Sequence, residues 1–303
     1  MENRPSSTEF GDLIQPFQVE GLGVRGRIVR LSTALFETIG AGRYPTDVSE
    51  LLAATMALGA ALASGLKYDG VFTLQAQGNG PVSLLLADMT SEGDLRAYAR
   101  FDADALAAVS DHSGGVVPRL LGAGHLAFTV DQGEDTERYQ GITELTGATL
   151  ADCAQTYFRQ SEQLETAIIL EALVEPGDTM RAAAFVVQKM PDAGPQGQEA
   201  GREAWQEAMV LSSTLTKLEL LNPGLSPSDL LYRLFHERGV RVFDEKPLRH
   251  ACRCSREKVE RTLASFPRTE IEAMKVNDEI SVSCEFCGVD YVFHDKDMEI
   301  IFS

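Results

Sequence analysis

Two close pairs of cysteines near the end of the chain constrain its fold more than any other feature. Cys252 and Cys254 form a C-x-C pair, residues 255–283 follow, and Cys284 and Cys287 then form a C-x-x-C pair. Two thiolate pairs joined by such an insert can supply four sulfurs to one tetrahedral ion, and zinc is the usual ion in four-cysteine sites. The segment is too short to build a large core, so a metal would supply much of its folding free energy. We therefore predict one Zn²⁺ ion bound by these four cysteines.

The surroundings of the second pair indicate a zinc-ribbon knuckle. A strand-like EISVS precedes Cys284, Gly288 follows Cys287, and VDYVF then resumes a strand pattern. Glycine can take the positive φ that turns backbone amides towards the sulfurs. The alternative is a thioredoxin-like redox pair, which needs its first cysteine at a helix N-terminus. The fifth cysteine, Cys153, lies in an apparent helix, and we interpret it as a core residue.

Oxidation of such a site has a consequence that the spacing suggests. Zinc links two segments that are far apart in the sequence, whereas a disulfide within either pair closes a very small loop and ties nothing distant together. Oxidation within the pairs would therefore unfold the C-terminal segment, so the cysteines could act as a redox switch of its fold. A structural zinc that senses nothing remains open, and spacing alone favours it.

Composition and charge limit the classes of partner. The chain of 303 residues is 44% hydrophobic, and its formal net charge is −18. Binding to phosphates or to anionic lipids needs clustered Lys and Arg, so we expect neither nucleic acid nor membrane as a partner. The apolar stretch 51–66 is short for a membrane span and predicts a buried core helix. The polar N-terminus lacks the pattern of a secretory signal, so we expect a cytoplasmic protein with reduced thiols.

The chain pattern predicts an α+β protein in three parts. Residues 1–189 form an N-terminal domain with a largely antiparallel sheet and helices, 190–240 form a linker with amphipathic helices, and 241–303 form a small zinc-binding redox-switch domain. Within the first part, residues 24–36 read as a strand whose arginines, Arg25, Arg27 and Arg30, face water. The segment GLGVRG precedes β-like residues rather than a helix, so it does not predict a dinucleotide site. We find no catalytic constellation and expect no enzyme.

The linker combines a polar entrance with an apolar helix face. Residues 191–201 are rich in Pro, Gly and Gln and read as a loop. A helix over 202–221 then presents a set of apolar residues at near-helical spacing. A second helix begins with Ser226 as its cap and Pro227 at its first position. The apolar set of the first helix is Trp205, Met209, Leu211, Leu215 and Leu218.

Several segments carry a resemblance to a known family. Besides the cysteine pairs, they are QPFQVEGLGVRGRIVRL (15–31), LQAQGNGP (74–81), RYQGITELTG (138–147) and YFRQSEQLETAI (157–168). With these segments in this order, essentially the whole chain resembles the 33-kDa heat-shock chaperonins, a family of redox-regulated bacterial holdase chaperones.

The resemblance implies an ATP-independent chaperone that is controlled by oxidation. In the reduced form Cys252, Cys254, Cys284 and Cys287 would hold zinc. Peroxide with unfolding stress, or hypochlorous acid, would release zinc and form the disulfides Cys252–Cys254 and Cys284–Cys287. The linker would lose structure, and the protein would bind unfolding clients, commonly as a homodimer, and later pass them to ATP-dependent foldases. The five apolar linker residues, from Trp205 to Leu218, would then become client-binding candidates because unfolding would remove their cover.

Two alternative functions, one enzymatic and one in protein binding, remain beside the chaperone. A thiol–disulfide oxidoreductase would use Cys284 and Cys287 as its active pair and would need a depressed thiol pKa. A zinc-ribbon adaptor would hold one protein partner and have no redox response.

Overall fold

The chain divides into two compact units, Met1–His250 and Ala251–Ser303. The structure, a computed structural model, describes residues 10–40, 42–109, 114–133, 138–175, 179–191 and 197–302. Residues 241–250, which we assigned to the C-terminal domain, lie in the first unit, where they form short strands paired with its sheets. The three-part division at 189 and 240 stays a prediction.

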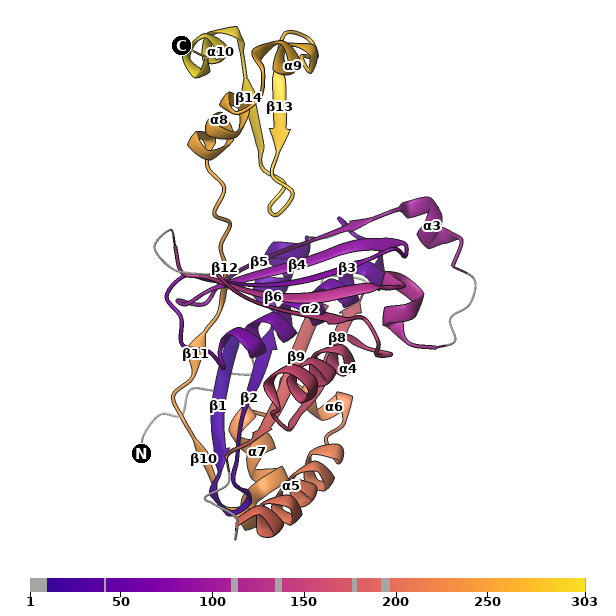
Figure 1. The fold of residues 1–303 in the computed structure, drawn as a ribbon, viewed down its shortest axis with the longest axis vertical. Coiled ribbons are helices and arrows are strands. Elements are labelled where there is room, and N and C mark those ends of the chain that lie inside the picture. Colours follow the sequence, from indigo (N-terminus) through magenta and orange to yellow (C-terminus); the bar gives the residue numbers. More distant parts are fainter. Residues whose placement is uncertain are drawn as a thin grey trace. The chain divides into compact units, whose positions relative to one another are not determined.

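One sheet of the first unit runs in the order β10-β1-β2-β9-β8, with β11 also paired to β1 (Figure 1). Every pairing within it is antiparallel. β9 reads as a near-continuous apolar run, a pattern typical of a strand that is buried on both faces. The strands are β1 (Leu13–Val19), β2 (Val24–Leu31), β8 (Thr166–Glu175), β9 (Thr179–Lys189), β10 (Val240–Val242) and β11 (Lys246–Pro247).

The second sheet of this unit runs in the order β12-β5-β4-β3-β6-β7. Its pairings are antiparallel except that of β12 with β5, which is parallel. The predicted α+β class with largely antiparallel sheets is therefore confirmed. The strands are β3 (Val71–Gly78), β4 (Val82–Thr90), β5 (Asp94–Phe101), β6 (Gly124–Asp131), β7 (Tyr139–Glu144) and β12 (Arg249–His250).

The helix α2 (Thr46–Ala63) packs against strands of both sheets and forms the centre of the main core. Its Gly59 lies against Leu74 of β3 and Ala87 of β4, where a small residue allows close approach. Among the described helices α2 is long and apolar enough to span a membrane, and 78% of that stretch is buried inside the protein. The predicted core helix is confirmed. Shorter helices of this unit are α1 (Thr33–Ile39), α3 (Ala103–Ala107) and α4 (Leu150–Tyr157), with helical turns at Glu20–Leu22, Val117–Leu121, Phe158–Glu162 and His236–Arg238.

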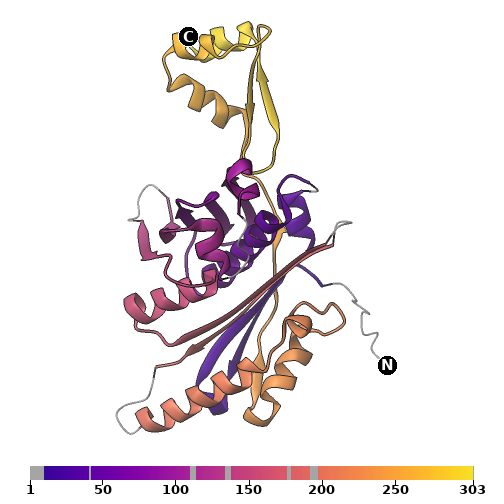
Figure 2. The ribbon, with the colours of Figure 1, turned by 90° about the vertical axis from the view of Figure 1, so that its right-hand side faces the viewer.

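The opposite face of the first sheet is covered by α5 (Gly197–Ser213), α6 (Lys217–Leu220) and α7 (Pro227–Phe235), drawn in orange in Figure 2. α7 begins as predicted, with Ser226 accepting a hydrogen bond from the amide of Asp229 and Pro227 in the first turn. Two expectations for this region are wrong. The loop expected over 191–201 gives way to helix α5 at Gly197, and residues 192–196 lie outside the described residues.

The single helix that we expected over 202–221 is two helices. The cause is a capping box, in which Thr216 accepts from the amide of Glu219 while the Glu219 carboxylate accepts from the Thr216 amide. This box ends the first helical register and starts α6.

The strand β2 is buried on both faces, so the wet face predicted for it is wrong. Arg25 is exposed, but Arg27 is 7% and Arg30 is 1% exposed. The reason is that α2 covers one face of the sheet and the linker helices cover the other. Arg30 Nη1 donates to the Leu225 carbonyl at 2.7 Å, and its guanidinium lies 4.9 Å from the centre of the Phe10 ring.

The second unit is small. It contains α8 (Arg256–Ala264), α9 (Arg268–Ala273), the antiparallel hairpin β13 (Ile280–Ser283) with β14 (Asp290–Phe293), and α10 (Asp295–Ile301). The Arg256 guanidinium lies 4.3 Å from the centre of the Phe293 ring and donates to the Val292 carbonyl. The buried core of this unit, within the part that the structure describes, consists of Leu263, Ile271, Ile280, Phe293 and Met298.

Candidate metal centre

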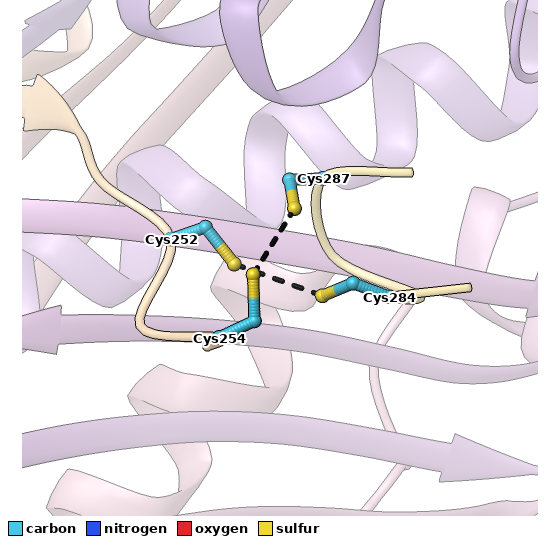
Figure 3. Close-up of side chains that lie close together, drawn as sticks. All are labelled: Cys252, Cys254, Cys284 and Cys287. Carbon is cyan, nitrogen blue, oxygen red and sulfur yellow. Dashed lines mark hydrogen bonds between the residues drawn. The ribbon is translucent and has the colours of Figure 1, made fainter. Parts of the chain in front are cut away.

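The four C-terminal thiols converge on one point of the second unit (Figure 3). All four sulfurs lie within 4.8 Å of one another, and the cysteines are unbonded thiols. The Sγ atoms of Cys252 and Cys284 are 3.7 Å apart, and those of Cys254 and Cys287 are 3.5 Å apart. Sulfurs bound at about 2.3 Å to a tetrahedral ion are spaced about 3.8 Å apart. The four cysteines can therefore hold a metal ion.

The second pair lies on the tight turn between β13 and β14, and the predicted strand–turn–strand is confirmed. Gly288 adopts a φ of 72°, and its amide donates to the Cys284 carbonyl at 2.8 Å. The Cys284 amide donates to the Val289 carbonyl at 2.9 Å, which closes the loop. A turn between strands offers no helix dipole to stabilise a lone thiolate, so the geometry does not favour a thioredoxin-like pair.

The first pair immediately precedes α8. Ser255 caps that helix by accepting from the amide of Lys258, and Lys258 Nζ donates to the Arg253 carbonyl at 2.6 Å. These contacts fix the backbone between Cys254 and the helix. The Tyr291 hydroxyl of β14 donates to Cys254 Sγ at 3.0 Å, so one sulfur has a hydrogen-bond donor from the opposite half of the site. Such outer partners orient metal ligands.

Electrostatics at Cys287 disfavour its thiolate in the metal-free cluster. Burial, together with the neighbouring thiols of Cys254, Cys252 and Cys284, raises the pKa of Cys287 to about 12. Several thiolates this close repel one another unless a cation balances them, so metal binding must displace protons. An oxidoreductase needs the opposite, a thiol whose pKa is depressed.

The remaining cysteine belongs to a different environment. Cys153 lies on α4 with none of its surface exposed, among the main-core residues of the first unit. Burial raises the pKa of its thiol, and the Gly147 amide donates to its sulfur. The interpretation of Cys153 as a core residue is confirmed.

The linker residues that we predicted as client-binding candidates are not equally covered. Trp205, Met209 and Leu211 are half-buried against the second core cluster, and Leu215 is 7% exposed. Leu218 is 85% exposed, so its predicted burial is wrong. The break before α6 turns Leu218 away from the sheet and brings Leu220 and Leu221 inward instead.

The sequence reasoning missed the sheet face that these helices cover. Phe17 of β1, Phe185 of β9 and Phe235 of α7 stack with ring centres 5.7 to 6.4 Å apart. Ile28 and Val187 extend the same apolar face. The continuous apolar run of β9 could have indicated this covered face, because such a strand has no polar side to turn towards water. Removal of the linker helices would expose this face together with the helix residues.

Comparisons with known proteins agree over nearly the whole chain. A model of the Hsp33 protein family matches residues 12–294. The chain is 42% identical over 291 residues to the 33 kDa chaperonin of Caulobacter vibrioides strain NA1000 / CB15N, covering 94% of this chain and 95% of the relative. It is 36% identical over 296 residues to the 33 kDa chaperonin of Ectopseudomonas mendocina, covering 97% and 96%.

A solved structure shares the fold. The crystal structure of the 33 kDa chaperonin of Thermotoga maritima superposes with a TM-score of 0.82 at 24% identity, covering 96% of this chain and 97% of that one. Its identity is too low to transfer more than the fold. The family match and the curated relatives show that this chain belongs to the Hsp33 family of chaperones, and the converging thiols agree with this assignment.

Proposed function

We propose that the protein is a redox-regulated, ATP-independent holdase, which binds unfolding proteins after oxidation of its four C-terminal cysteines. The observation that carries the proposal is the convergence of two distant cysteine pairs within 4.8 Å, in a unit whose described core has only five buried apolar side chains. Such a unit depends on what its thiols bind. A change at sulfur can therefore become a change of fold.

The resident ion of the reduced form is Zn²⁺, one per chain, held by Cys252, Cys254, Cys284 and Cys287. Four sulfur donors at tetrahedral spacing favour zinc among the common cellular cations, because Mg²⁺ and Ca²⁺ prefer oxygen ligands. Zinc has no redox chemistry of its own, so the oxidisable groups are the cysteines.

Oxidation converts the ligands into groups that cannot hold the ion. Two thiolates of one pair lose two electrons and form a disulfide, and hydrogen peroxide accepts these electrons and, with two protons, leaves as two water molecules. Two such steps give Cys252–Cys254 and Cys284–Cys287. Disulfide sulfurs carry no negative charge, so Zn²⁺ is released. The two local loops do not connect the distant segments that zinc connected.

Loss of the metal-held fold then loosens the linker, residues 190–240. Its helices cover Phe17 and Phe185, so displacement of Trp205, Met209, Leu211 and Leu215 exposes both apolar surfaces to clients. Leu218 is already exposed and is available in either state. The oxidised chain acts as a homodimer in the cytoplasm and later passes clients to ATP-dependent foldases.

Light scattering from a chemically unfolded client tests the function. The reduced, zinc-loaded protein should not suppress aggregation, whereas protein treated with peroxide under mild heat should suppress it, and a thiol reductant should reverse the effect. A Cys153→Ala variant should behave like the unmodified protein. Equal suppression by both forms, or none by either, would contradict the proposal.

Disulfide mapping of the oxidised protein by mass spectrometry tests the switch. In the reduced cluster the Sγ atoms of Cys252 and Cys284 are 3.7 Å apart and those of Cys254 and Cys287 are 3.5 Å apart, and both contacts lie across the pairs. Disulfides along those contacts would keep the distant segments linked and leave the fold closed. The proposal requires bonds within the pairs, and mapped bonds across them would refute the release step.

A further inference from the structure

Within the part of the chain that the structure describes, a buried arginine of the first unit lacks a counter-ion. Arg27 is 7% exposed, and its one hydrogen bond among the described residues runs from Nη2 to Oε1 of Gln188 at 2.7 Å. Its Nε is enclosed and has no acceptor. Burial and the nearby Arg25 guanidinium lower the pKa of Arg27 to about 10, so it remains charged at neutral pH. A buried charge without a partner is costly and calls for an explanation.

Arg27 lies at the wall of a cavity of about 370 Å³. This volume is in the range of ligand sites, about 300 to 1,000 Å³. The cavity lies among the end of α2, the strands β2 and β9 and the elements around β6, β7 and α4. Its apolar lining includes Leu62, Leu66, Phe72, Phe128, Val130 and Phe158.

The charges around the cavity are positive in a chain that is strongly acidic. Among the lining residues that the structure describes, Arg25, Arg27 and Lys67 are cationic and one, Glu162, is a carboxylate. Glu162 is exposed, and its Oε1 already accepts hydrogen bonds from the hydroxyls of Tyr139 and Tyr157, at 2.5 and 2.7 Å. The carboxylate therefore belongs to a tyrosine network and does not neutralise Arg27.

The space for the guanidinium depends on a glycine. A Cβ at Gly65 would lie 2.0 Å from Arg27 Nη1, so only the absence of a side chain there lets the group take this position. On its other side Gln188 is 4% exposed and donates from Nε2 to Thr166 Oγ1 at 3.3 Å. The arrangement holds a forked cation in a fixed place beside an apolar cavity.

We propose that this cavity is a binding site for a small monocarboxylate with an apolar body, whose carboxylate pairs with the Arg27 guanidinium. A carboxylate matches the planar fork of arginine and supplies the missing counter-charge. The apolar walls take the body of the ligand, and Arg25 and Lys67 at the exposed rim favour the approach of an anion. The site lies entirely within the first unit and is independent of the thiol switch.

Calorimetric titration of the reduced, zinc-loaded protein with octanoate tests the site. We expect one octanoate per chain, and binding of 1-octanol should be weaker by about 10- to 100-fold because it lacks the charged hydrogen bonds. Arg27→Gln should weaken octanoate binding by the same factor. Gly65→Ala, which keeps every charge but displaces the guanidinium, should also weaken it, whereas Arg100→Gln on β5 should not.

A thermal midpoint measured without ligand separates a binding arginine from a structural one. If Arg27 serves a ligand, Arg27→Gln removes an unpaired buried charge, and the midpoint should stay or rise. A lower midpoint together with unchanged octanoate binding would assign Arg27 to structure and overturn the proposal. Equal binding of octanol and octanoate, or non-saturating uptake of many molecules per chain, would also overturn it.

Discussion

The two units of this chain reach a folded state by different means. The first surrounds α2 with two sheets and covers the outer face of one of them with three helices, so it buries two extended apolar clusters. The second buries five apolar side chains in its described part and gathers four thiols within 4.8 Å. A small core rarely supplies more than about 3 to 5 kcal/mol. The contrast shows where stability is conditional: in the first unit it depends on packing, and in the second on the ligand state of sulfur.

Removal of the metal should have the largest effect. Chelation of zinc from the reduced protein should unfold residues 251–302, because structural zinc contributes on the order of 10 kcal/mol to a site of this kind. It should also loosen the linker helices and leave the two sheets of the first unit intact. Hydrogen exchange measures both units in one sample. Amides of β13 and β14 should lose protection, while those of β3 and β4 should keep it.

The matched variants for this experiment are Cys284→Ser and Cys153→Ala. The first removes one sulfur of the cluster and should reproduce the effect of chelation, whereas the second removes a buried thiol of the first unit and should leave the zinc content unchanged. Full protection of β13 and β14 without metal would contradict the contrast between the two units, because the small core would then be sufficient to fold the second unit.

Truncation of one buried phenylalanine in each unit sharpens the comparison. Phe185 and Phe293 both have no exposed surface, and Phe→Ala at such sites costs about 3 to 5 kcal/mol. Phe185→Ala should lower the unfolding midpoint of the first unit and leave zinc affinity unchanged. Phe293→Ala should weaken zinc binding by about 100-fold or more, because binding and folding of the second unit are coupled. Competition with a chromophoric chelator measures the affinity.

The parts of the fold that the sequence predicted are those that local chemistry determines. The knuckle followed from two strand patterns, a C-x-x-C and Gly288, which all lie within a short stretch of chain. The start of α7 followed from Ser226 and Pro227 in the same way. The burial of Arg27 and Arg30 could not be predicted, because it depends on which distant helices cover each face of β2. The helix break at Thr216 could have been predicted from its T-x-x-E pattern, which we overlooked.

Loss of a helix cap should have a smaller effect. In the linker it should change activation by peroxide, and in the second unit it should change zinc affinity. Thr216 caps α6, and its partner Glu219 also forms an ion pair with Arg233 of α7 at 2.8 Å. Thr216→Ala should cost about 1 kcal/mol and lower the temperature at which peroxide activates the protein. Ser255→Ala at the cap of α8 should instead weaken zinc binding by about fivefold. If both variants changed zinc affinity equally, linker and zinc unit would be one cooperative element.

Titration with acid should give the smallest effect, and its sign differs between the units. In the second unit acid protonates the thiolates and releases zinc, so this unit loses stability as the pH is lowered. In the first unit burial raises the pKa of Asp12 above its usual 3.8, although its Oδ1 accepts from the amides of Ser32 and Ala34. The folded form therefore holds the Asp12 proton more tightly than the unfolded form, and this contribution is lost as pH rises from about 4 through the folded pKa.

The variant Asp12→Asn keeps the Oδ1 acceptor but cannot titrate. The difference in unfolding free energy between the unmodified protein and this variant should shift in favour of the variant as pH rises from 3 to 7, by about 1 kcal/mol or less since Asp12 is partly solvated. Urea unfolding of zinc-free protein at each pH isolates the first unit for this measurement. A difference that moves in the opposite direction would mean that the two amide hydrogen bonds outweigh burial, and that Asp12 acts as an ionised cap of α1.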